Sequence, residues 1–284
     1  MSLLAATSPW ALHAHPLLWS LAVAGVAGYV LAVRRWTGPG TLSPALQPGQ
    51  AAAAVCALAV LVAAAGWPID DLAARGLLSG LVLEHLLLSL VVAPLLILAV
   101  PTALWHRLFS TRRRLRAARL IARPVIALPP FNVLMVTLHL PAAISLQAQE
   151  HAWHGVLVAV LLLFAMLMWW PVLCPLPEAG GLDEPRKMLY LFVQSVALTF
   201  SASWLAFGTP PNPALKDPPW ALTAAVDQTI AGVLVVFLGG VLLWLAIGAQ
   251  FLKGQARERA GEDEEAITWE DFERELETWD LRRH

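Results

Sequence analysis

Residues 76–105 read GLLSGLVLEHLLLSLVVAPLLILAVPTALW, and this stretch decides the class of fold. It is apolar and long enough to cross a bilayer, which takes about 20 residues of α-helix. Glu84 and His85 nevertheless stand inside it. Ionisable side chains at membrane depth are costly, so they indicate a functional site whose other members must be sought elsewhere in the chain.

The composition of the whole chain supports a helical membrane protein. Of its 284 residues, 58% are hydrophobic and only 14% are charged, whereas a soluble domain carries about a quarter charged residues. Apolar runs longer than about 18 residues recur along the chain, and they favour helices over the short alternating strands of a membrane barrel. The two cysteines form no C-x-x-C pair, so no disulfide framework is expected.

The pattern of apolar runs predicts an all-α protein with a seven-transmembrane helix bundle. Breaks rich in Pro and Gly separate the runs, as is usual for turns. In the third span, Pro94 predicts a kink inward of His85 and Pro101 predicts the end of the span. The expected spans are about 16–33, 51–67, 76–105, 125–146, 153–173, 188–207 and 222–252.

The distribution of Lys and Arg predicts the orientation of the bundle. With the N-terminus outside and the C-terminus in the cytoplasm, 14 basic residues near the span ends face the cytoplasm and only Arg75 and Lys216 face outward. Seven of the 14 arginines and lysines fall in one loop, at Arg107, Arg112, Arg113, Arg114, Arg116, Arg119 and Arg123. This loop is interpreted as a topology determinant beside anionic lipid, and no nucleic-acid partner is expected.

A polar tail follows the membrane domain. Residues 1–252 are predicted to form the seven-span membrane domain and residues 253–284 a charged cytoplasmic tail. Trp269, Phe272, Leu276 and Trp279 recur at helical spacing, which predicts a short amphipathic helix in the tail. Trp169 and Trp170, in contrast, are expected to form part of an aromatic belt at the inner membrane interface.

The polar residues of the spans gather in the outer half of the predicted bundle. By helical rise, His85 lies about 13 Å and His139 about 10 Å from the outer surface. His151 and His154 begin the fifth span on one helix face, and Asp227 lies one turn into the seventh. His85 and His139 are therefore expected to lie close together, with His154 or Asp227 beside them.

Three kinds of chemistry fit such a cluster. Imidazole and carboxylate ligands at similar depth suit a transition metal such as copper. Two facing histidines also fit a haem iron, and a chain of histidines and carboxylates fits a proton relay. The candidate metal ligands are His85, His139, His154, Asp227, Glu84 and His151. No nucleophile–base pair or cofactor fingerprint is present, so an enzyme is not expected.

Several short motifs occur in an order that resembles the CtaG family of multi-span cytochrome c oxidase assembly factors. They are EHLLL (84–88), APLLILAVP (93–101), HLP (139–141), WWPVL (169–173), LYLFVQS (189–195) and DQTIAG (227–232). The resemblance implies a multi-pass protein of the inner (plasma) membrane that assists oxidase maturation through copper delivery or retention. Its implied partners are the oxidase subunits and the lipid bilayer.

The chain also departs from the family pattern. Leu81 stands where the third span of the family carries an earlier histidine, and Leu157 and Val158 replace a Glu-His pair in the fifth span. His85, His139 and His154 match the family positions. Either Glu84, His151 or Asp227 replaces the missing ligands, or the protein acts as an accessory or structural subunit without metal. A haem-binding or proton-conducting protein is the third alternative.

Overall fold

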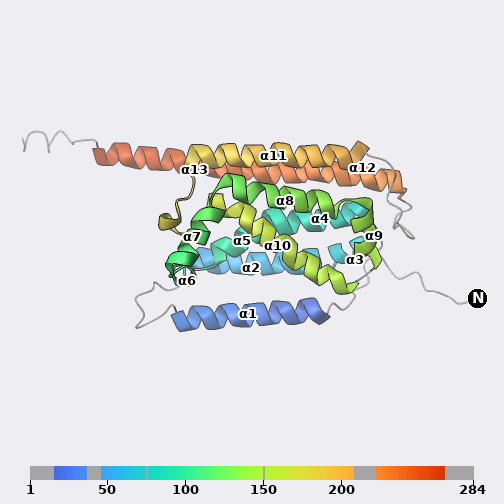
Figure 1. The fold of residues 1–284 in the computed structure, drawn as a ribbon, viewed down its shortest axis with the longest axis horizontal. Helices are drawn as coiled ribbons and strands as arrows, with labels where there is room; N and C mark the ends of the chain where they lie inside the picture. The colour runs from blue at the N-terminus through green and yellow to red at the C-terminus, as the bar shows by residue number, and fades with distance from the viewer. Residues whose placement is uncertain (1–15, 37–45, 75, 150, 208–221, 266–284) are drawn as a thin grey trace, which may run out of the picture.

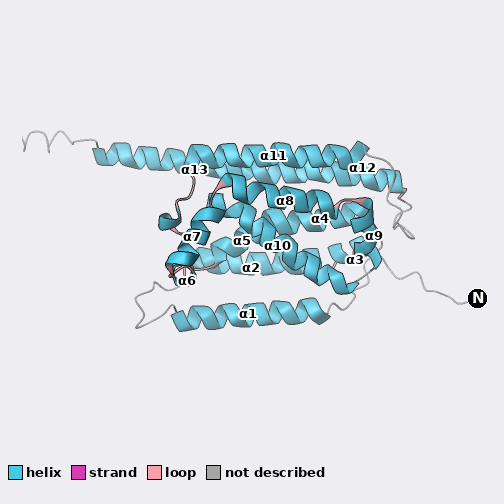
Figure 2. Cartoon of the chain, in the orientation of Figure 1, coloured by secondary structure: helices cyan, strands magenta, loops and turns pink. Residues whose placement is uncertain are grey.

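The chain folds into a bundle of helices. A computed structural model describes residues 16–36, 46–74, 76–149, 151–207 and 222–265, and no strand occurs within these ranges (Figure 2). The helices are α1 (Pro16–Trp36), α2 (Pro48–Ala65), α3 (Ile69–Ala74), α4 (Leu78–Leu87), α5 (Ala93–Ala99), α6 (Thr102–Leu108), α7 (Arg112–Ile121), α8 (Pro124–Leu138), α9 (Pro141–Gln149), α10 (His151–Leu173), α11 (Glu184–Phe207), α12 (Ala224–Leu234) and α13 (Gly240–Glu265). The shorter elements are the π-helical turns η1 (Leu88–Val92) and η4 (Val235–Gly239) and the 3₁₀ turn η2 (Pro177–Ala179).

The stretch of residues 78–99 forms the centre of the bundle. It runs as α4, η1 and α5, and it packs against α2, α10 and α12 (Figure 1). The long helices lie roughly side by side, with α1 at one edge and α11 with α13 at the other (Figure 1). Of an 18-residue window within this span, 61% is buried inside the protein, the largest share found for any candidate span of the described residues. The rest of the chain is therefore arranged around the stretch that holds Glu84 and His85.

The predicted all-helical membrane fold is confirmed, but the number of seven spans is not. Among the described residues, four helices are long and apolar enough to cross a membrane: Pro48–Ala74, Leu78–Ala99, Gly155–Leu173 and Ala224–Arg259. A fifth span results if α7 and α8 are counted as one, although these helices meet at 67°. The arginine-rich segment expected as a loop is thus largely helical, as α6 and α7.

The third span ends where Pro101 predicts, whereas the kink predicted near Pro94 stays a prediction, because residues 78–99 run on as one helical span that contains a π-helical turn. The π-helical turn η1 ends at Val92, two residues before Pro94, and α5 ends at Ala99, directly before the extended Val100. Proline has no backbone N–H, so it leaves a carbonyl of the preceding turn without its helical donor. A π turn is one of the local adjustments by which membrane helices accommodate this loss.

The interpretation of Trp169 and Trp170 as an interfacial belt is wrong. Each indole is only 4% exposed. Trp169 donates to the backbone oxygen of Ser89 and Trp170 to that of Ala118, at 2.9 and 3.3 Å. Both indoles therefore bind backbone inside the bundle, where a buried N–H must find an acceptor.

The polar tail begins as a continuation of the last helix. The helix α13 runs without interruption past residue 253 to Glu265, and Arg257 forms an ion pair with Glu184 at the start of α11. The amphipathic helix predicted for residues 269–279 lies outside the described residues.

Candidate metal site

His85 is held at the core of the bundle by the close packing of α4. Its side chain is only 4% exposed. One turn earlier, Gly80 faces α3 so closely that a Cβ atom would lie 2.9 Å from the backbone nitrogen of Ala73. Only glycine permits this approach of two helices. The position of His85 therefore depends on a contact that the sequence alone does not reveal.

His139 follows the last residue of α8 and is oriented by its own helix. Its Nδ1 atom lies 2.7 Å from the backbone oxygen of Met135. Because a carbonyl oxygen can only accept, Nδ1 carries a hydrogen, and in the neutral ring Nε2 then keeps a lone pair. Nε2 is buried and has no hydrogen-bond partner in the described structure.

The rings of His85 and His139 lie against each other, as predicted from their depth. Their centroids are 5.2 Å apart, and the ring planes meet at 85° in an edge-to-face contact. The pair joins the third span to the C-terminal end of α8, which are 54 residues apart in sequence. The predicted proximity of these two imidazoles is confirmed by this geometry.

The arrangement around His139 is one that metal sites use. A ligating histidine usually donates its second ring N–H to a backbone carbonyl or carboxylate, which fixes the tautomer and leaves the other nitrogen for the metal. Met135 supplies that carbonyl here. The buried lone pair of Nε2, with a second imidazole beside it, is consistent with a nitrogen-ligated transition metal.

Asp227 is occupied with a different task. Its carboxylate is fully buried and accepts hydrogen bonds from the backbone nitrogens of Leu78 and Ser79, at 2.7 and 3.1 Å, and from the Ser79 hydroxyl. These are donors at the N-terminus of α4, where a helix leaves N–H groups unsatisfied and favours negative charge. Ser79 lies about 9 Å along the helix axis from His85. Asp227 thus caps the central helix from a distant span.

Three further carboxylates are buried on α4 or on α3 beside it. Glu84 is fully buried, and Asp70 and Asp71 are 6% and 5% exposed on α3, which packs against α4. The sequence interpretation included Glu84 but missed the two aspartates. The available signal was their position shortly after Pro68, where an apolar run ends, because acidic residues are favoured in the first turn of a helix.

The two remaining candidates cannot be placed by their side chains. His151 and His154 lie in the first turn of α10, but their side chains fall outside the described part of the structure. Among the side chains that are described, no group of three His, Cys, Asp or Glu residues is arranged to hold a metal ion. The described site is therefore the His85–His139 pair alone.

Comparisons with known proteins agree with the motif order. Residues 27–255 match the family described as cytochrome c oxidase caa3 assembly factor (Caa3_CtaG). The matched segment contains the central span, the His85–His139 pair and Asp227. The comparisons with curated proteins and with solved structures gave no match. The resemblance to the CtaG family that the motifs indicate is confirmed.

Proposed function

The chain belongs to the family of cytochrome c oxidase caa3 assembly factors, and from this premise we propose that it carries copper to the oxidase at the His85–His139 pair. Copper is the cargo in this proposal and not a resident cofactor. The observation that carries it is the buried Nε2 of His139, whose ring is oriented through Nδ1 and lies against the ring of His85.

The chemistry of the pair suits transient carriage. Neutral imidazoles bind copper well, and a site with only two protein nitrogens leaves positions at which the acceptor protein can supply ligands. A closed site with four protein ligands would instead retain its metal, as structural sites do. Glu84, His151 and His154 are the nearest candidates in sequence for a further ligand. Asp227 is less suited because its oxygens already accept backbone hydrogen bonds.

The proposal includes a seven-span topology with the His85–His139 pair in the outer half of the membrane. To the four apolar spans it adds α8, with α7 left on the cytoplasmic side, and it adds α1 and α11, which have 21 and 24 residues. At 1.5 Å per residue these helices are about 31 and 36 Å long, enough to cross the hydrocarbon core. The basic residues at the ends of the spans support a cytoplasmic C-terminus.

An accessory role without metal is the competing proposal, and one observation favours it. Leu81, Leu157 and Val158 stand at positions where the resemblance implies ligands, and Leu81 and Val158 are buried among hydrophobic side chains. A haem held between His85 and His139 is disfavoured by geometry. The two rings are in direct edge-to-face contact, which leaves no space for a porphyrin between them.

Copper binding to purified protein tests the proposal. We expect the full chain to bind Cu(I) and the His85→Ala and His139→Ala variants to lose most of this copper, because each removes one of the two imidazoles. Acid should release the metal by protonating the ligands. His106→Ala is the matched control, because the His106 side chain is 47% exposed and lies beyond α5.

The cellular arm of the experiment separates the two proposals. If the protein carries copper, cells with either site variant should insert the protein normally but accumulate less copper-loaded, active oxidase. Normal oxidase in both variants, together with no copper in the purified wild-type protein, would contradict the copper proposal and support the accessory role.

A further inference from the structure

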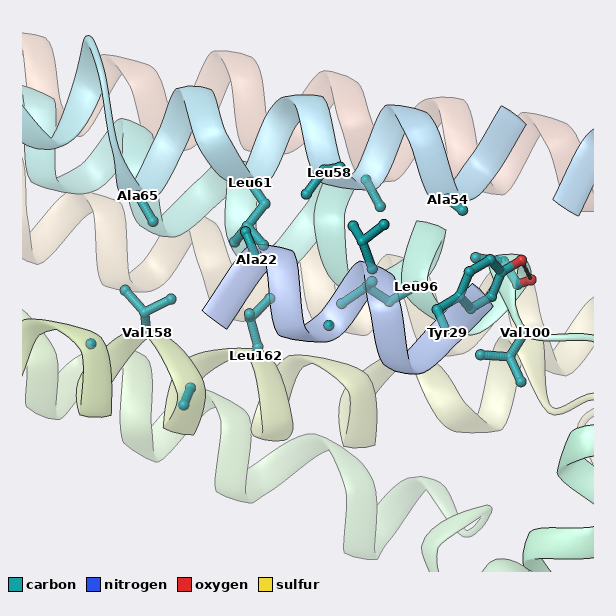
Figure 3. A pocket seen from close by; sticks show the side chains of 16 residues that line it. Ala22, Tyr29, Ala54, Leu58, Leu61, Ala65, Leu96, Val100, Val158 and Leu162 are labelled. Carbon is teal, nitrogen blue, oxygen red and sulfur yellow. Dashed lines mark hydrogen bonds between the residues drawn. The ribbon is translucent and has the colours of Figure 1, made fainter. Parts of the chain in front are cut away.

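A second feature of the bundle is an apolar pocket between α1 and its neighbours (Figure 3). The α1 pocket has a volume of about 320 Å³ and is lined by residues of α1, α2, α5 and α10 together with Val100. Tyr29 carries the only hydroxyl among the lining side chains, and this hydroxyl donates to the backbone oxygen of Ala99 at 2.9 Å. The pocket therefore offers a ligand no polar side chain other than this hydroxyl, whose hydrogen is already donated.

The pocket exists because α1 stands away from the bundle where small residues face it. Helix α1 packs against α6, at the end of the bundle that carries the arginines. Farther along, Gly25 of α1 and the small residues Ala54 and Ala57 of α2 all line the pocket. A Cβ atom added at Gly25 would meet nothing within 4 Å. An empty slot of this kind loses dispersion contacts on its walls, and in a bilayer hydrocarbon is the material available to fill it.

The shape of the α1 pocket suits a chain better than a ring. Along α2 its lining extends from Ala54 to Ala65, which is about 16 Å by helical rise (Figure 3). Tyr29 and Val100 lie at one end, and Val158 lies toward the other (Figure 3). The pocket therefore runs along the helices, in the direction that a lipid acyl chain takes in a membrane.

Positive charge lies at the Tyr29 end of the pocket. Val100 lines both the α1 pocket and a second pocket of about 680 Å³, whose lining includes Arg107. Arg34 and Arg35 lie in the last turn of α1, the helix that contacts α6, and α6 carries Arg107. Guanidinium groups bind phosphate oxygens through paired donors. Basic pockets between membrane helices are sites for anionic lipid headgroups.

From this continuity of an apolar slot with a basic end, we infer that the protein binds one anionic phospholipid between α1 and the bundle. One acyl chain fills the α1 pocket, and the phosphate lies at Arg107, with Arg34 and Arg35 beside it. Because lipid tails are as apolar as the pocket walls, the headgroup charge supplies the selectivity and the pocket supplies the packing. This site is separate from the His85–His139 pair and does not depend on copper.

A pair of glycine variants tests the apolar part of the site. Gly25→Phe places a ring in the α1 pocket, whereas Gly28→Phe adds the same ring to α1 at a glycine that does not line the pocket and whose added Cβ also meets nothing within 4 Å. The proteins are purified in detergent from membranes that contain phosphatidylglycerol, and retained lipid is identified by native mass spectrometry. We expect one phospholipid on the wild type and on Gly28→Phe, and at least a fivefold loss on Gly25→Phe. Equal retention in all three proteins would overturn the inference.

The headgroup part is tested in nanodiscs of phosphatidylcholine with added phosphatidylglycerol. We expect the wild type to enrich phosphatidylglycerol in its retained lipid and Arg107→Gln to lose that preference while it still retains a lipid. No preference in the wild type, or retention of a prenylquinone instead of a phospholipid, would contradict the proposed ligand.

If Gly25→Phe does not fold, a phospholipid with a diazirine-labelled acyl chain tests the apolar pocket in the wild type. Crosslinks on α1, α2 and α10 support the site, and crosslinks confined to other helices refute it.

Discussion

Asp227 joins the seventh predicted span to the start of the central helix. Its carboxylate satisfies two backbone N–H groups of α4, which are 149 and 148 residues away in sequence. A buried N–H without an acceptor costs about 1–3 kcal/mol, and no lipid group can replace the carboxylate. We infer that this side chain fixes the depth and rotation of the helix that carries His85.

Replacing Asp227 should therefore destabilise the bundle. We expect Asp227→Ala to lower the free energy of unfolding by about 1–3 kcal/mol for each N–H that loses its acceptor. Ser79→Ala is the control, because it removes only the hydroxyl donor and should cost about 0.5–1.5 kcal/mol. Unfolding in mixed detergent micelles, followed by circular dichroism, measures both. A variant as stable as Ser79→Ala would show that Asp227 is not an important cap.

His85 and His139 show which features of the site could be predicted from the sequence. Depth along a helix follows from counting residues, so His85 and His139 could be predicted to lie close together. Counting does not give rotation about the helix axis, and so it could not distinguish Asp227 as a cap from Asp227 as a possible ligand. The same limit applies to Asp70 and Asp71, whose burial depends on the close contact of Gly80 with α3.

The π-helical turn η1 accounts for the position of Trp169. Within η1 the N–H of Ala93 donates to the oxygen of Leu88, five residues earlier. In the same register the oxygen of Ser89 would accept from residue 94, but Pro94 has no N–H. The indole of Trp169, on α10, donates to Ser89 instead, at 2.9 Å. A donor from a neighbouring helix thus replaces the one that proline removes.

A double-mutant cycle tests this replacement. We expect Trp169→Phe to lower the free energy of unfolding by about 1–3 kcal/mol, because it leaves the Ser89 oxygen without a donor. Pro94→Ala should be nearly neutral in the wild type but should restore stability to Trp169→Phe, because alanine supplies the missing N–H. Unfolding of all four proteins in the same micelles gives the coupling energy. Additive effects of the two substitutions would contradict the explanation.

At the level of elements, the sequence predicted best those features that depend on a residue's effect on the backbone of its own helix. Pro101 indicated where the third span ends, and Pro94 lies just after the π-helical turn η1, since the loss of an N–H is a local effect. Trp169 and Trp170 were misinterpreted because tryptophan is common both at membrane interfaces and in cores, and the acceptors that decide between them lie on other elements. The arginine-rich segment was expected as a loop because its arginines interrupt the apolar runs that indicate spans. It forms α7 instead, which buries Ala118.

The whole molecule is arranged around residues 78–99, which lie in the apolar stretch 76–105 from which the fold class was predicted. Residues 78–99 have the largest buried share of the candidate spans, and they hold both Glu84 and His85. Long apolar runs were sufficient to predict the helical membrane fold. The number of crossings is harder to derive because α7 and α8 meet at 67°, which hydropathy along the chain cannot reveal.

The topology prediction belongs to this largest scale. If the bundle has seven spans and follows the basic residues, α6 and α7 lie in the cytoplasm and the connection between α11 and α12 lies outside. A reporter that is active only in the cytoplasm should therefore be active when fused after Arg119 and inactive when fused after Lys216. A reporter active only outside should give the opposite pattern, and a fusion after Glu265 should match the one after Arg119. Cytoplasmic activity after Lys216 would reverse the orientation and place the His85–His139 pair in the inner half of the membrane, where copper delivery to an outer-leaflet acceptor would no longer be geometrically reasonable.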